Sequence, residues 1–190
     1  MARYDKEHKQ ATRQRIIEMA GHRFKTDGID GSGVATLMAD AGLTNGAFYA
    51  HFASKDDLVA NVVADQLHAQ AEAFGGLPPG RAGLEEFLRE YLSPQHRDNP
   101  GVGCPSAALL DEIGRCAAPV KDAYTEGTRA ILDEIAVRLA PEDPRSAFGK
   151  AVGLYTMAVG TLQLSRALSD RKLAEDVLEQ GIQNARVFLR

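Results

Sequence analysis

The chain has 190 residues, 44% of them hydrophobic and 25% charged, which is enough to bury a full core in one domain or two smaller ones. No apolar run approaches the eighteen or so residues needed to cross a bilayer, and the first ten residues lack the apolar core of a signal peptide. We therefore expect a cytoplasmic protein with no membrane partner. The two cysteines, Cys104 and Cys116, are too few for a disulfide framework or a four-ligand zinc site, and we expect no metal or cofactor.

The net charge of −4 is unevenly distributed along the chain. Residues 1–25 contain seven lysines or arginines and three acids, a local charge of +4, so the remainder carries −8. A basic segment joined to an acidic body is the pattern expected of a DNA-binding head on a body that does not bind DNA, because attraction to phosphates acts locally. A solvated basic tail is the alternative interpretation.

Apolar residues recur at helical spacing from the start of the chain, and the alternating pattern of strands is missing, which predicts an all-α fold. The first helix is expected at residues 12–28 and a short second helix at 33–42. A third short helix is expected at 44–52. A fourth, capped by the side chain of Ser54, is expected at 55–74.

The sequence "GGLPPG" at residues 75–80 is the clearest break and predicts a loop. A second loop, rich in proline and glycine, is expected at residues 93–103. The remaining helices are expected at 81–92, 105–116, 119–140, 144–169 and 173–190.

The segment "LTNGAFYAHF", residues 43–52, combines aromatic rings with small side chains. With the turn "AGLT" before it, this pattern indicates a helix-turn-helix, in which Gly42 permits the backbone reversal and Leu43 enters the core. Phe48 and Phe52 would anchor the third helix, leaving an outward face of small and hydrogen-bonding groups that fits a major groove. The alternative is that the aromatic side chains only pack beneath the fourth helix.

From Thr12 to Val63 the sequence resembles the DNA-binding head of the tetracycline-repressor (TetR) family of bacterial transcription regulators. The resemblance is carried by "AGLT", "FYAHF" and "SKDDL", with Phe24 and Gly28 at their expected distances upstream. It implies an all-α homodimer, an operator with approximate two-fold symmetry, and an N-terminal three-helix DNA-binding domain at residues 1–53. It also implies a C-terminal helical domain, residues 54–190, that binds a small effector and dimerises.

The resemblance also suggests which residues contact operator DNA. Asn45 is the best candidate for base readout, because its amide can pair with adenine. Gly33, Met38 and Ala50 depart from the common family pattern. This suggests fewer direct contacts, with a larger role for Tyr49, Lys55, Thr36 and the basic N-terminal arm. The expected DNA-binding residues are Thr36, Thr44, Asn45, Gly46, Ala47, Tyr49, His51 and Lys55.

Apolar residues surround more than one face of the predicted helix 144–169, which predicts burial on several sides. The family resemblance implies that this helix and the last one form a four-helix bundle across a two-fold axis, and close helix approach would offset the propensity cost of Gly149, Gly153 and Gly160. A central core helix of a monomer is the alternative. The expected interface residues are Val152, Tyr155, Val159, Leu162, Val177, Ile182 and Ala185.

A mainly apolar effector pocket is expected among the middle helices. Its expected lining residues are Phe74, Phe87, Tyr91, Cys104, Leu109, Ile113, Tyr124 and Met157. Cys104 is expected at the start of a helix, where its thiol could react with oxidants or electrophiles. This suggests a second candidate function, a redox-sensing or electrophile-sensing regulator. The alternative is that Cys104 is a buried structural thiol.

No motif of nucleophilic catalysis, metal-dependent hydrolysis or nucleotide binding occurs, so an enzyme is not expected. The sequence predicts a sequence-specific DNA-binding regulator. A repressor that is released from its operator by a small effector is the main hypothesis, and an activator is the alternative.

Overall fold

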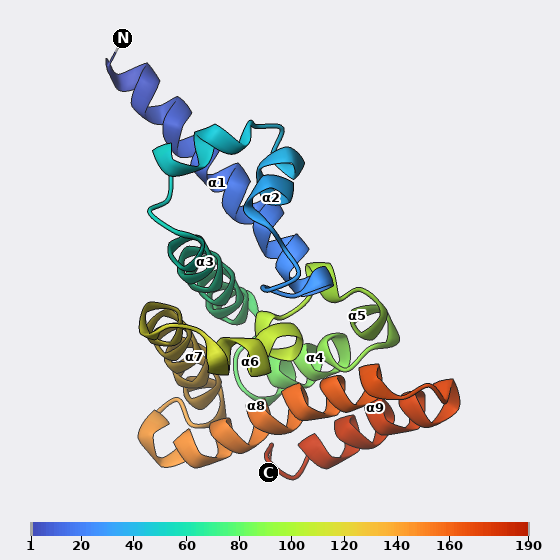
Figure 1. The fold of residues 1–190 in the computed structure, drawn as a ribbon. Coiled ribbons are helices and arrows are strands. Elements are labelled where there is room, and N and C mark those ends of the chain that lie inside the picture. Colours follow the sequence, from blue (N-terminus) through green and yellow to red (C-terminus); the bar gives the residue numbers. More distant parts are fainter. Residues whose placement is uncertain (1, 190) are drawn as a thin grey trace.

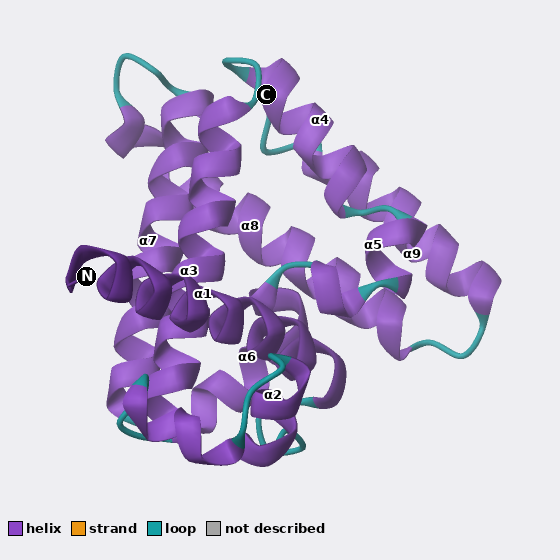
Figure 2. Ribbon diagram, turned by 90° about the horizontal axis from the view of Figure 1, so that it is seen from above, coloured by secondary structure: helices purple, strands orange, loops and turns teal. Residues whose placement is uncertain are grey.

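The computed structural model describes residues 2–189, with side chains described from residue 7 onward. Every secondary-structure element in the described part of the chain is a helix, so the all-α prediction is confirmed (Figures 1 and 2). The elements of the N-terminal head are α1 (Ala2–Asp27), α2 (Val34–Asp40) and the 3-10 helix η1 (Asn45–Ala50). None of the helices described is long and apolar enough to cross a membrane.

The head packs around one aromatic and aliphatic core. Phe24 of α1, Leu37 of α2 and Phe48 of η1 are each at most 1% exposed. Gly28 and Gly42 have φ angles of 82° and 70°, so each supplies the left-handed turn residue expected between two helices. The helix-turn-helix arrangement follows, with α2 and η1 packed against each other and α2 against α1.

Two elements of the head differ from the prediction. α1 begins at Ala2, ten residues earlier than expected, because residues 2–11 contain good helix formers and no glycine or proline. The third helix is a 3-10 helix, closed by bonds such as Ala47 N–H to the Thr44 carbonyl, 3.0 Å. A six-residue segment containing Gly46 favours this tighter, short form.

Helix α3 (Lys55–Gly76) runs from the head into the body (Figure 1). As predicted, Ser54 caps it by accepting a hydrogen bond from Asp57 N–H at 3.1 Å. The helix continues two residues into the expected loop. Its most extensive packing is with α7 (Ala118–Leu139), where Gly127 lies so close to Leu67 that a Cβ at that glycine would collide with it.

The rest of the body is also helical. The predicted loop at residues 93–103 instead contains two short helices, because Ser93 Oγ accepts from His96 N–H at 3.1 Å and Pro94 begins the first turn. The elements are α4 (Arg81–Tyr91), α5 (Pro94–Asp98), η2 (Pro100–Val102), α6 (Pro105–Arg115), α8 (Pro144–Ala167) and α9 (Arg171–Ala185).

Helices α8 and α9 pack together as an antiparallel pair, and α8 also packs on α7 (Figure 1). This packing places part of the expected dimer interface in the protomer's own core: Tyr155, Val159, Leu162 and Ala185 are at most 5% exposed. The expectation for these four is corrected, because their faces of α8 and α9 are already covered within the chain. Val152, Val177 and Ile182 are half-buried.

A different face of this helix pair is open. On α8 this open face includes the exposed Leu164. A Cβ at Gly149 or Gly160 would meet no atom of this chain. Since these two glycines are three turns apart, they share one side of α8, and that side is open to a partner.

Candidate functional site

The outer surface of the helix-turn-helix consists of small and polar side chains. Tyr49 is 77% exposed while the neighbouring Phe48 is 1% exposed, and the two rings pack edge to face with centroids 5.2 Å apart. The exposed members of the predicted DNA-binding set are Thr36, Thr44, Asn45, Gly46 and Tyr49. They lie on or next to α2 and η1, so the structure brings them to one end of the head.

Ala47 and His51 are less accessible than the other members of the predicted set. Ala47 is half-buried against the head core. Burial, followed by the charges of Lys9 and Arg13, lowers the pKa of His51, so its ring is neutral at pH 7. A neutral ring offers a hydrogen bond to a phosphate but no charge.

Lys55 is held inside the head. Its ammonium donates to the Ile29 carbonyl at 2.5 Å, and the Ile29 N–H donates to a carboxylate oxygen of Glu112 on α6 at 2.7 Å. The turn after Gly28 is therefore hydrogen-bonded both to Lys55 of α3 and to Glu112 of the body. Lys55 thus has a structural partner besides any phosphate, which the sequence did not indicate.

Arg23 fixes α1 to α2. Its Nε and Nη2 donate to the two carboxylate oxygens of Asp40 at 2.8 and 3.1 Å, which is bidentate geometry. This hydrogen bonding keeps the pKa of Asp40 below its ordinary value. The pair links α1 to α2 within the head.

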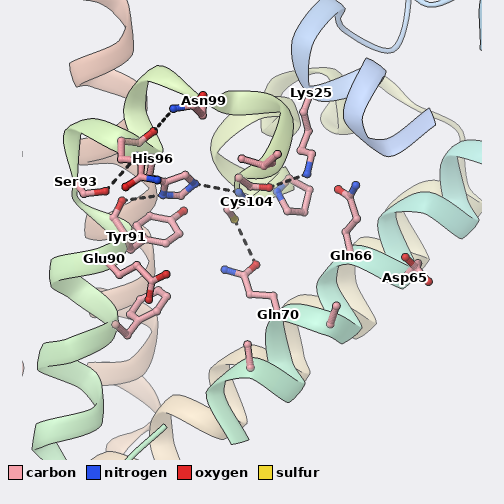
Figure 3. A pocket seen from close by; sticks show the side chains of 17 residues that line it. Lys25, Asp65, Gln66, Gln70, Glu90, Tyr91, Ser93, His96, Asn99 and Cys104 are labelled. Atoms are coloured by element: carbon pink, nitrogen blue, oxygen red, sulfur yellow. Dashed lines mark hydrogen bonds between the residues drawn. The ribbon is translucent and has the colours of Figure 1, made fainter. Parts of the chain in front are cut away.

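A cavity of about 690 Å³ lies where the head meets the body (Figure 3). Its walls come from α1, α3, α4 and the segment 93–105. The lining residues are Lys25, Asp65, Gln66, Ala69, Gln70, Ala73, Phe87, Glu90, Tyr91, Ser93, Gln95, His96, Asn99, Val102, Gly103, Cys104 and Pro105.

Three of the predicted pocket residues line this cavity: Phe87, Tyr91 and Cys104. The other five do not, and the prediction is corrected for them. Phe74 is buried beneath Phe87, with ring centroids 4.4 Å apart. Leu109 and Ile113 pack in the core, and Met157 packs against it on α8. Tyr124 donates its hydroxyl to Ser106 Oγ at 2.9 Å, away from the cavity.

The cavity is more polar than the sequence predicted. Lys25 of α1 reaches it and donates from Nζ to the Gly103 carbonyl at 2.8 Å. Burial lowers the pKa of Lys25 to about 8. The nearby Cys104 partly opposes this change, and the positive charge of Arg166 adds to it. The only sequence signal for this role was a lysine directly after the buried Phe24.

His96 organises the wall around Cys104. Its Nε2 accepts from the Cys104 N–H at 3.1 Å, so the ring proton is on Nδ1, which donates to the Tyr91 carbonyl at 2.8 Å. Burial lowers the pKa of His96, which agrees with this neutral form. The Cys104 thiol, 6% exposed, donates to Gln70 Oε1 at 3.4 Å.

Two buried polar atoms on the cavity wall lack a hydrogen-bond partner among the described residues, Tyr91 Oη and Gln66 Oε1. Tyr91 lies beside Cys104, and burial raises the pKa of its hydroxyl well above the ordinary value. Buried groups of this kind are normally satisfied. Their presence here indicates a site that an added molecule would complete.

The N-terminal head matches a known protein family. Residues 16–62 match the model of the family described as bacterial regulatory proteins, tetR family. The regulator AcrR of Shigella flexneri is 37% identical over 62 residues, which are 33% of this chain and 29% of AcrR. TtgR of Pseudomonas putida is 41% identical over 68 residues, 36% of this chain and 32% of TtgR. The match thus spans about a third of each relative.

Solved structures share the fold of nearly the whole chain. The reduced form of NemR from E. coli has a TM-score of 0.79 and 16% identity, over 95% of this chain and 97% of NemR. A TetR-family regulator of Agrobacterium tumefaciens has a TM-score of 0.76 and 17% identity, over 93% and 98%. FadR of Bacillus subtilis, in complex with stearoyl-CoA, has a TM-score of 0.63 and 15% identity, over 89% and 97%.

Proposed function

Because residues 16–62 match the model of the family described as bacterial regulatory proteins, tetR family, we propose that the chain is a homodimeric repressor of that family that reads operator DNA in the cytoplasm. A small molecule in the cavity would release it. Residues 1–53 would bind DNA, and residues 54–190 would dimerise and, together with Lys25 of α1, bind the effector. We propose no catalytic role.

One observation carries the DNA-binding role: the exposed face of η1 holds small and polar residues above a buried aromatic core. Phe48 supports this face from below, while Asn45, Gly46 and Tyr49 point outward. Small residues allow the backbone to approach the major groove, and Asn45 supplies both a donor and an acceptor for a base edge. The same residues lie within the segment that matches the family model.

Selection of genomic fragments by the purified protein, followed by footprinting, tests this proposal. We expect protection of two half-sites related by a two-fold axis, because a symmetric dimer presents two identical readers. An absence of enriched fragments at physiological salt would contradict the proposal.

Asn45→Ala is expected to weaken binding to the selected duplex by about tenfold or more and to relax base preference at one position of each half-site. Binding of a panel of single-base operator variants measures this. Glu179→Ala on α9 is the control, since its exposed side chain lies far from the head. If Asn45→Ala keeps the base preference of the parent protein, Asn45 is not the base-reading residue.

The position of the cavity supports the proposed release. Lys25 joins the cavity wall to α1 of the head, and Cys104 lies at the start of α6, whose Glu112 grips the turn at Ile29. A ligand that moves the start of α6 would therefore act on the head at two places. Effector and operator would then oppose each other by favouring different positions of the two heads.

A second candidate function is sensing of electrophiles through Cys104. The observation that favours it is the thiol's place on the cavity wall, beside the cations Lys25 and Arg166. Addition to N-ethylmaleimide would form a carbon–sulfur bond across the reagent's double bond, and the other carbon would take a proton.

For this second candidate, N-ethylmaleimide is expected to release the parent protein from the selected duplex and to leave Cys104→Ser bound. Cys116→Ser serves as the control and should respond like the parent protein. Equal release of parent protein and Cys104→Ser would rule this function out.

A further inference from the structure

Lys25 lines the cavity and Arg166 lies behind its wall, beside Gly103; neither cation has a carboxylate partner in the described part of the chain. The Lys25 ammonium donates to the Gly103 carbonyl, and the Arg166 guanidinium donates to three backbone carbonyls within residues 96–107 at 2.9 to 3.1 Å. Both side chains are half-buried. Their charge is therefore only partly compensated by carbonyl dipoles.

The Tyr91 hydroxyl adds a free donor on the same side of the cavity. Tyr91 is 5% exposed, and its hydroxyl lies beside the Cys104 thiol without a hydrogen bond of normal geometry to any described residue. Figure 3 shows Tyr91, Cys104 and Lys25 around one region of the cavity. His96 does not compete for a ligand there, because both of its ring nitrogens are already bonded.

Apolar surface lies beside these groups, since the Phe87 ring packs next to Tyr91 with centroids 5.0 Å apart. Phe87 from α4 and Ala69 and Ala73 from α3 offer hydrocarbon surface. Two carboxylates also line the cavity: Glu90 is exposed to solvent and Asp65 accepts a hydrogen bond from Gln14 at 3.0 Å. The two carboxylates are thus solvated or already hydrogen-bonded, while the ammonium of Lys25, which has no carboxylate partner among the described residues, is more buried.

We infer that the cavity binds a small amphipathic anion, whose carboxylate accepts hydrogen bonds from Lys25 and Tyr91 and whose hydrocarbon part lies against Phe87 and the alanines of α3. Charge-assisted bonds of this type are short and strong. The volume of about 690 Å³ falls in the range of small-molecule sites. Gln66 Oε1 is an acceptor, so it would bind a hydroxyl or amide elsewhere on such a ligand.

This inference deepens the effector role and rests on the proposed function for its regulatory meaning. Since Lys25 belongs to α1, a carboxylate would draw it from the Gly103 carbonyl that now links the head to the body. Binding of an anion in the cavity would thereby loosen one of the contacts between the head and the body.

Calorimetry at pH 7 with three eight-carbon probes tests the inference: octanoate, 1-octanol and octylamine. Because the chains are matched, differences report the head group. Octanoate is expected to bind at least about tenfold more tightly than octanol, and octylamine more weakly than either. Octanol binding as tightly as octanoate, or octylamine binding most tightly, would overturn the inference.

Variants locate the carboxylate. Lys25→Met is expected to weaken octanoate about tenfold and to change octanol less than twofold, and Tyr91→Phe should weaken octanoate by about threefold to tenfold. Lys25→Gln replaces Lys25→Met if the latter fails to fold by circular dichroism. An equal loss for octanoate and octanol in these variants would overturn the assignment.

DNA binding is measured separately on the same preparations. A protein that binds the selected duplex but shows no preference for octanoate contradicts this inference and leaves the proposed function standing. A protein that prefers octanoate but selects no duplex contradicts the proposed function and leaves the anion site standing.

Discussion

Phe48→Ala is expected to lower the free energy of unfolding by about 3–5 kcal/mol, the usual cost of emptying a fully buried aromatic site. Phe48 is 1% exposed, and its ring lies against Phe52 with centroids 5.7 Å apart. A cavity at this place removes the support of η1, so we also expect loss of specific DNA binding. Urea denaturation measures the first effect, and titration with the selected duplex measures the second.

Tyr49→Ala is the matched control, since it removes the adjacent ring from the outside of the same helix. Tyr49 is 77% exposed, so the loss of stability should not exceed about 1.5 kcal/mol, the value of an aromatic pair. Its effect should fall on DNA affinity. If Phe48→Ala and Tyr49→Ala destabilise the chain equally, our assignment of an inward and an outward face is wrong.

Gly160→Leu is expected to raise the dissociation constant of the proposed homodimer by about a hundredfold or more. Overpacking costs about 1–3 kcal/mol per site, and a two-fold interface contains the change twice. A Cβ at Gly160 meets no atom of the described residues within 4 Å, so the added side chain would disturb a partner helix. Analytical ultracentrifugation over a dilution series measures the change.

If α8 has no partner, Gly160→Leu is instead expected to stabilise the chain. In a monomer, replacing an exposed mid-helix glycine with leucine stabilises the helix by roughly 0.8 kcal/mol through propensity alone. Gly114→Leu is the control, because a Cβ there also meets nothing but the site is on α6. A Gly160→Leu chain that gains stability and keeps its oligomeric state would exclude this face as the interface.

The head could be predicted from the sequence because its signals are local. Gly28 and Gly42 mark turns that need positive φ, and Ser54 lies three residues before the N–H that it caps. Such features depend on neighbours within a few residues. The 3-10 form of η1 was missed, since short helices differ little in apolar spacing.

The cavity could not be predicted in the same way. Periodicity indicates that Leu109 and Ile113 face inward, but it does not say which inward region stays open. Lys25 and Cys104 are far apart in sequence and meet only because α1 packs against the segment before α6. Their meeting depends on tertiary packing, which apolar spacing does not encode.

The dimer face shows the same limit. Apolar residues surround most of α8, so Tyr155 and Val152 were equally good candidates by composition. In the fold, Tyr155 faces α6, where its Oη lies 2.8 Å from Ser106 Oγ in a buried hydrogen bond, and α7 and α9 also pack on α8. Which side of α8 remains open depends on these three neighbours.

The central claim is that two copies of this chain place the segment beginning at Leu43 in successive major grooves of a duplex. Fluorescence anisotropy with the selected duplex and with a shuffled duplex of equal length and composition tests it most directly. We predict two protomers per duplex and at least about a thousandfold tighter binding to the selected sequence at physiological salt. Equal affinity for the two duplexes, or saturation at one protomer, would contradict the account.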